Sequence, residues 1–176
     1  SGAELRSLAL TVLIGGFETT SAVISNVAVT LLADRSRWES LVADPAVLPT
    51  AVEELLRWHP LSMTFPRVAT EDVDLGGVTV RAGELAVVPF AAVNRDPGLH
   101  DDPDRLDLRR QPAPNLTFGH GAHHCLGAHL ARVELTEVLT ALVELVPGLR
   151  LAVPAEELCY ELVPPIGRPE SVPVTW

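Results

Sequence analysis

The apolar positions of this chain recur at helical spacing through its first third. In residues 3–32 they form one continuous face, as a helix packed against a core requires. Two shorter helical patterns follow, over residues 35–42 and 45–58. They are separated at Asp44-Pro45, because the residue before a proline is disfavoured in the helical conformation. The pattern therefore predicts three helices in succession.

An extended pattern of alternating residues follows the third helix, over residues 65–97. Two dipeptides interrupt it, Gly76-Gly77 and Ala82-Gly83. Glycine supplies the backbone conformation that tight hairpins need, so both dipeptides predict hairpin turns between short strands.

Helical spacing returns at Cys125 and is broken at Pro147-Gly148, a typical end of a helix. Beyond it, short strands are predicted at residues 149–154, 158–163 and 172–176, with a loop tip at 164–166. The whole pattern predicts a mainly α fold with a small β portion, in one domain over residues 1–176.

Cys125 lies at the predicted entrance to the last helix. The free N–H groups and the positive end of the dipole at a helix N-terminus favour a thiolate, which is the form that binds metal. Gly119, Gly121 and Gly127 surround it and allow the backbone to approach a flat or bulky group. The simpler alternative is a buried free thiol that packs as a small apolar side chain.

The spacing of the residues around Cys125 favours the metal-binding thiolate over the buried free thiol. Phe118, Gly121, Cys125 and Gly127 match the pattern F-x-x-G-x-x-x-C-x-G, and the segment closely resembles the haem-binding loop of the cytochrome P-450 family. The resemblance implies that Cys125 is the axial thiolate ligand of the iron of haem b. It also implies that Phe118, Gly119, Gly121 and Gly127 border the haem.

A second motif, GGFETT, occupies the middle of the first helix. Two glycines, an acid and two threonines suit the centre of a buried helix poorly, so they predict either a kink with threonines bonded to the preceding turn or a distortion that admits a small ligand. The motif resembles the oxygen-binding segment of the family's I helix. By that resemblance Glu18 and Thr19 steer protons toward bound oxygen, and Gly15 and Gly16 line the pocket.

Glu54 and Arg57 stand three residues apart in the third predicted helix, so their side chains can pair on one face. An exposed pair of this kind would stabilise the protein little. The segment resembles the E-x-x-R motif of the family's K helix, which implies a buried pair that braces the haem loop. A third member would come from residues 103–110, where the sequence does not decide between Arg105 and Arg109; we take Arg105.

Two further residues are assigned by the resemblance alone. Arg67 takes the place of an arginine that binds a haem propionate, and a planar guanidinium suits a carboxylate. His123 takes the place of a second propionate donor. Residues 61–65 would then face the substrate. A strand-edge arginine in water is the alternative for Arg67.

Composition changes this picture little. The formal charge of −10 argues against nucleic acid as a general partner. No charge-free apolar run of about 18 residues was found, so no membrane span is predicted. Two cysteines far apart indicate a reducing, cytoplasmic setting without a disulfide framework.

Two rival functions fit parts of the sequence. Histidine and cysteine together can ligate zinc, and several histidines lie near Cys125, although their spacing matches no standard zinc motif. These histidines are His120, His123, His124 and His129. The other rival is an inactive truncated or split fragment that only folds or binds a partner.

The resemblance covers nearly the whole chain but only the C-terminal part of the family fold, from the I helix to the final strands. It therefore implies a missing N-terminal segment or chain. For the complete protein it implies a soluble bacterial haem-thiolate monooxygenase, which inserts one oxygen atom from O2 into a small organic molecule. Electrons would come from NAD(P)H through ferredoxin reductase and a ferredoxin.

Overall fold

A computed structural model describes residues 1–60, 66–163 and 166–176. Its longest element is helix α1, Gly2–Ala33. The helix begins at a capping box, in which Ser1 and Glu4 each accept a hydrogen bond from the other's backbone or terminal nitrogen. It continues through GGFETT without a break in its helical assignment. The kink or distortion predicted at this motif therefore does not interrupt the helix.

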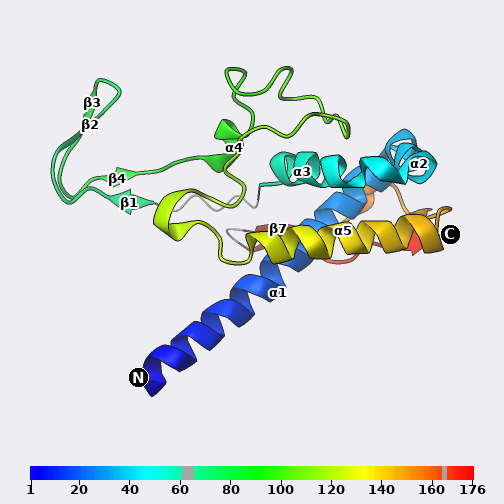
Figure 1. The fold of residues 1–176 in the computed structure, drawn as a ribbon, viewed down its shortest axis with the longest axis horizontal. Coiled ribbons are helices and arrows are strands. Elements are labelled where there is room, and N and C mark those ends of the chain that lie inside the picture. Colours follow the sequence, from blue (N-terminus) through cyan, green and yellow to red (C-terminus); the bar gives the residue numbers. More distant parts are fainter. Residues whose placement is uncertain (61–65, 164–165) are drawn as a thin grey trace.

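The core is one cluster of side chains from α1 and three other helices (Figure 1). These are α2 (Arg35–Ala43), α3 (Leu48–Trp58) and α5 (Ala128–Leu145). The C-terminal half of α1 contributes fully buried side chains such as Val27 and Leu31, whereas α3 and α5 lie side by side over it. The indole of Trp38 on α2 is buried and donates to the carbonyl of Pro147 at 2.9 Å, which fastens α2 to the end of α5.

Helical predictions for the first third are confirmed within a residue or two, with one refinement. The third predicted helix is divided into a 3-10 turn, η1 (Pro45–Val47), and α3. A proline at each of positions 45 and 49 suits the first turn of a helix, where its missing N–H is not needed.

The turn predicted at Gly76-Gly77 is a hairpin between β2 (Val73–Leu75) and β3 (Val78–Val80), and both glycines have positive φ. The hairpin predicted at Ala82-Gly83 is wrong. Gly83 does turn the chain, with φ of 89°, but β4 (Leu85–Ala86) pairs with β1 (Arg67–Val68) and not with β3. The β2–β3 hairpin is thus an insertion at the end of the β1–β4 ladder (Figure 1).

The chain ends in two more antiparallel pairs. One joins β5 (Arg150–Leu151) to β8 (Val174–Thr175), and the other joins β6 (Tyr160–Val163) to β7 (Ile166–Pro169). Ile166 therefore begins a strand, which corrects its place in a loop tip; the two prolines of that tip lie outside the described residues. Three short helical turns complete the elements: α4 (Phe90–Val93), η2 (Gly121–His123) and η3 (Ala155–Glu157).

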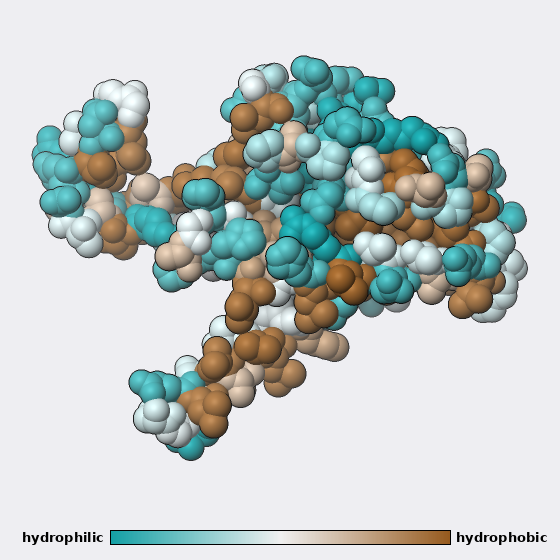
Figure 2. Space-filling view, in the orientation of Figure 1, coloured by the Kyte–Doolittle hydropathy of each residue, from teal (hydrophilic) through white to brown (hydrophobic). Residues whose placement is uncertain are grey.

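The N-terminal half of α1 projects from the core, and its apolar side chains are visible as a brown band (Figure 2). By length and composition alone, α1 could cross a membrane. Core helices of soluble proteins and signal sequences meet the same criterion, and only 11% of the most apolar stretch of α1 is buried inside the structure. The polar Glu18 and Thr19 occupy the boundary between the projecting and the packed halves.

Candidate functional site

Cys125 is exposed in the loop between η2 and α5. Its backbone N–H donates to the carbonyl of Phe118 at 2.9 Å, which closes the cysteine loop, residues 118–127. Inside the loop, the N–H of His124 donates to the carbonyl of Gly121 at 3.0 Å. The helix begins only at Ala128, with Gly127 as its N-cap, so the prediction that it begins at Cys125 is wrong by three residues.

Glycine is required at two positions of this loop. Gly119 and Gly121 have φ of 72° and 74°, a region that residues with a Cβ enter at a cost. At Gly127 an added Cβ would lie 4.0 Å from the Cys125 sulfur, which is ordinary contact. The first two glycines thus shape the loop, and the third leaves space beside the thiol.

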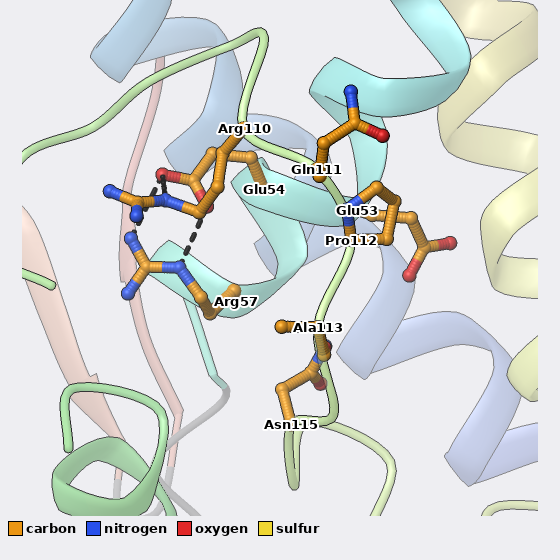
Figure 3. A pocket seen from close by; sticks show the side chains of 8 residues that line it. All are labelled: Glu53, Glu54, Arg57, Arg110, Gln111, Pro112, Ala113 and Asn115. Atoms are coloured by element: carbon orange, nitrogen blue, oxygen red, sulfur yellow. Dashed lines mark hydrogen bonds and ion pairs between the residues drawn. The ribbon is translucent and has the colours of Figure 1, made fainter. Parts of the chain in front are cut away.

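Glu54 and Arg57 form a buried, two-pronged ion pair on α3 (Figure 3). Arg57 Nε lies 2.7 Å from Glu54 Oε2, and Arg57 Nη2 lies 2.9 Å from Glu54 Oε1. Both side chains are at most 3% exposed. Burial raises the pKa of Glu54, but the hydrogen bonds from Arg57, the Asp107 N–H and Arg110 outweigh it, so the pKa lies below its usual value.

The third member of this cluster is Arg110, and the choice of Arg105 is wrong. Arg110 Nε lies 3.1 Å from Glu54 Oε1, and its side chain is only 13% exposed. Arg105 is 62% exposed and pairs with Asp102 and Asp107. The chain turns at Asp107, whose backbone N–H donates to Glu54 at 3.0 Å. This turn brings Arg110 to the Glu54 carboxylate. The alternative, Arg109, reaches Asp44 instead.

Asn94 extends this cluster toward the cysteine loop. It is fully buried, its carbonyl oxygen accepts from Arg57 at 2.7 Å, and its side-chain amide donates to the Thr117 hydroxyl at 2.9 Å. The Asn94 side-chain oxygen also accepts the N–H of Leu116 at 2.7 Å. Since residues 116 and 117 directly precede Phe118, an unbroken set of hydrogen bonds links α3 to the cysteine loop.

On α1, the Thr19 hydroxyl donates to the carbonyl of Gly15 in the preceding turn. Glu18 pairs with Arg168 of β7, with 3.1 Å between Oε2 and Nη1. An added Cβ at Gly15 or Gly16 would meet no other atom of the described residues within 4 Å. Both glycines therefore face space in the described part of the chain.

The two expected propionate donors are exposed. Arg67 lies in β1, where its Nη1 donates to the Pro66 carbonyl at 3.4 Å, and His123 is in η2, within the cysteine loop. Their assignment to propionates stays a prediction. The expected substrate-facing segment, residues 61–65, lies outside the described residues.

The zinc alternative finds no support in the described residues, where no three His, Cys, Asp or Glu side chains gather around a point that could hold a metal ion. Both cysteines are free thiols.

Four residues of the site were missed by sequence reasoning: Asn94, Arg110, Arg132 and Arg168. No signal in the sequence marks Arg110 over its neighbours. Arg132 is the last residue of the cysteine segment, one α-helical turn into α5, and that place could have drawn attention to it. Arg168 lies 150 residues from its partner Glu18, so its contact depends on tertiary structure alone.

A sequence model of the family described as "Cytochrome P450" matches residues 1–145. The chain is similar to nocardicin C N-oxygenase of Nocardia uniformis subsp. tsuyamanensis, 47% identical over 175 residues, which are 98% of this chain and 44% of that protein. It is also similar to mycinamicin IV hydroxylase/epoxidase of Micromonospora griseorubida, 43% identical over 175 residues, which are 98% of this chain and 44% of that protein.

Among solved structures, the chain is similar to the LnmA cytochrome P-450 hydroxylase from the leinamycin biosynthetic pathway of Streptomyces atroolivaceus S-140. The TM-score is 0.93 at 45% identity, over 100% of this chain and 46% of that one. The chain thus spans less than half the length of the relatives it matches. The predicted fold class and the predicted family resemblance are both confirmed.

Proposed function

This chain belongs to the cytochrome P-450 family, and from that premise we propose that it is the haem-binding part of a bacterial monooxygenase. The observation that carries the proposal is the exposed thiol of Cys125, held in a loop whose two turning glycines have positive φ. A thiol in a buried, closed site could not reach a ligand, whereas this one is accessible and lies beside Gly127, where no Cβ intrudes.

The donor set of the loop fits a haem group. Cys125 would supply the axial thiolate, and Phe118, Gly119, Gly121 and Gly127 would border the macrocycle. Arg67 and His123 carry donors suited to the two propionates. When bound, the haem supplies the activation of O2, which the thiolate favours by donating electron density.

Glu18 and Thr19 are the proposed proton-handling groups. They are adjacent on α1, so their side chains point about 100° apart and can act at different stages. Thr19 Oγ1 now donates to Gly15, and rotation of the hydroxyl would free its proton for a ligand on the pocket side. The Glu18 carboxylate pairs with the Arg168 guanidinium and is half exposed to solvent. In the proposal, Glu18 passes protons inward from solvent.

For the complete protein, the proposal extends to its substrates and partners. A small organic molecule would receive one atom of O2, and NAD(P)H would supply electrons through a ferredoxin reductase and a ferredoxin in the cytoplasm. Relatives that are named as an N-oxygenase and a hydroxylase/epoxidase support this class of reaction. The alternative is a truncated or split fragment that folds without chemistry.

The test is the spectrum of the reduced CO adduct after haem loading. We expect the long-wavelength Soret band of thiolate ligation in the parent protein and in Cys159→Ala, and its complete loss in Cys125→Ala. Both cysteines are exposed, so the pair is matched for accessibility. A band that persists in Cys125→Ala would disprove thiolate ligation by this residue.

A further inference from the structure

Arg132, on the first turns of α5, joins three parts of the structure. Its Nε donates to Glu53 Oε1 at 2.6 Å and its Nη2 donates to Glu53 Oε2 at 3.3 Å, so it forms a two-pronged pair with α3. The guanidinium carbon also lies 4.5 Å from the centroid of the Phe118 ring. A third contact, from Nη1 to the Ala128 carbonyl at 3.2 Å, holds the side chain along its own helix.

Phe118 is the residue through which these contacts reach the cysteine. Its ring is partly buried against the core on one side and is covered by the Arg132 guanidinium. Its carbonyl accepts the Cys125 N–H at 2.9 Å. Phe118 therefore contacts both residues and connects the Arg132 side chain to the backbone of Cys125.

The geometry of the Arg132–Glu53 pair favours a fixed orientation of the Phe118 ring. A planar guanidinium that meets a carboxylate with two nitrogens has a defined orientation, and it then presents a flat face to an aromatic ring. Both side chains are about two-thirds to three-quarters buried, so solvent screens the pair less than it screens an exposed pair.

We propose that Arg132, held by Glu53, is a positioning residue for the cysteine loop. It fixes the Phe118 ring and, through the Phe118 carbonyl, the position of the Cys125 N–H and sulfur. Hydrogen bonds and dipoles around a thiolate ligand set the reduction potential of its iron, so a displaced loop changes that potential. This inference rests on the proposed haem-thiolate function.

Amide hydrogen exchange at Cys125 tests the positioning role without haem or activity. Arg132→Gln and Glu53→Gln should each speed exchange of the Cys125 N–H at least about tenfold, because the acceptor carbonyl of Phe118 becomes mobile. Arg132→Lys should restore only part of the protection, since lysine keeps the charge but neither the fork nor the flat face. Arg105→Gln, at an exposed arginine with two aspartate partners, is the matched control and should leave the exchange rate unchanged.

The second measurement is made in haem-loaded protein. Arg132→Gln should shift the reduction potential and increase severalfold the share of reduced CO adduct that lacks the thiolate band, while Arg105→Gln should change neither. Exchange at Cys125 that is equal in Arg132→Gln, Glu53→Gln and Arg105→Gln would overturn the positioning role. If the parent protein showed no thiolate band, the proposed function would fail, whereas the exchange experiment would still decide the role of Arg132.

Discussion

Glu54 shows how one buried carboxylate organises the side of the molecule that carries the cysteine loop. It accepts hydrogen bonds from Arg57 and Arg110 and from the Asp107 backbone N–H. These donors come from a helix and from a loop more than fifty residues later. The carboxylate thus closes a long excursion of the chain, and its loss would leave two arginines without a counter-ion.

The first residue-scale prediction concerns this cluster. Glu54→Ala should lower the free energy of unfolding by about 3–5 kcal/mol, because it leaves buried positive charge without compensation. Arg110→Ala should also destabilise, whereas Arg105→Ala should change stability by no more than about 1 kcal/mol, as an exposed pair does. Chemical denaturation of the three variants measures this. A Glu54→Ala protein as stable as its parent would contradict the structure of the cluster.

The second residue-scale prediction concerns His59, whose ring nitrogen Nε2 lies 2.6 Å from the Thr30 hydroxyl. Burial, followed by the positive charge of Arg95, lowers the pKa of His59 to about 4 from its usual 6.5. Between these two values the unfolded chain binds a proton that the folded chain does not. Stability should therefore fall as pH falls from about 6.5 to 4, by at most about 1.4 kcal/mol per pH unit.

Denaturant titrations between pH 7 and 4 measure that dependence. His59→Gln keeps a side chain that can bond Thr30 but cannot be protonated, so its stability should vary less with pH. His100 is buried, and burial and the charges of Arg57 and Arg110 lower its pKa too, so part of the dependence should remain. Identical pH profiles for the parent and His59→Gln would rule out a contribution from His59.

At the scale of elements, α1 is one helix whose two halves have different surroundings. Its C-terminal half is packed against the core, while its N-terminal half is exposed, and GGFETT lies between them. Thr19, Ser21 and Ser25 all donate side-chain hydrogen bonds to carbonyls of the preceding turn. Such bonds satisfy the hydroxyls within the helix, which explains how a polar motif is accommodated without a break.

The element-scale prediction concerns Thr19 in the complete enzyme. Thr19→Ala should leave NAD(P)H consumption largely intact but divert most reducing equivalents to peroxide, because the hydroxyl proposed to donate the proton is lost. Thr11→Ala is the matched control, since Thr11 makes the same bond to the preceding turn, at 2.9 Å to Ser7, away from the motif. The ratio of product to peroxide is measured together with the melting temperature. An unchanged ratio in Thr19→Ala would reduce its role to helix structure.

At the scale of the whole molecule, the N-terminal half of α1 exposes an apolar surface. Its apolar side chains are each 54–68% exposed: Leu5, Leu8, Leu10, Val12, Leu13, Ile14 and Phe17. A continuous apolar surface of this kind is typical of an interface (Figure 2). The chain spans less than half the length of the relatives it matches.

The isolated chain should therefore self-associate. Leu8→Glu combined with Leu13→Glu should weaken association at least about tenfold, because each leucine contributes about 1.5–3 kcal/mol when buried. Val78→Glu, at an equally exposed position of the β2–β3 hairpin, should have little effect. Sedimentation velocity over a range of concentrations distinguishes them. Monomeric behaviour of the parent chain at high concentration would contradict an apolar interface on α1.

The sequence by itself determined the features that depend on local periodicity and fixed spacing. The four long helices, the Gly76-Gly77 hairpin and the family of the chain all follow from patterns within about thirty residues, where backbone geometry relates each residue to the next. The individual roles of Cys125, Glu18 and Thr19 rest on the same kind of spacing, and they stay predictions until the spectra and ratios above are measured.

Tertiary structure alone decided the contacts between distant segments. It selected Arg110 over Arg105 beside Glu54, paired β1 with β4, brought Arg168 to Glu18 and placed Arg132 between Glu53 and Phe118. Each of these depends on the path of a loop, which turns on a few backbone dihedrals and on what the core leaves open. Neighbouring arginines are chemically equivalent in a sequence, and only the fold brings one of them within reach of a buried carboxylate.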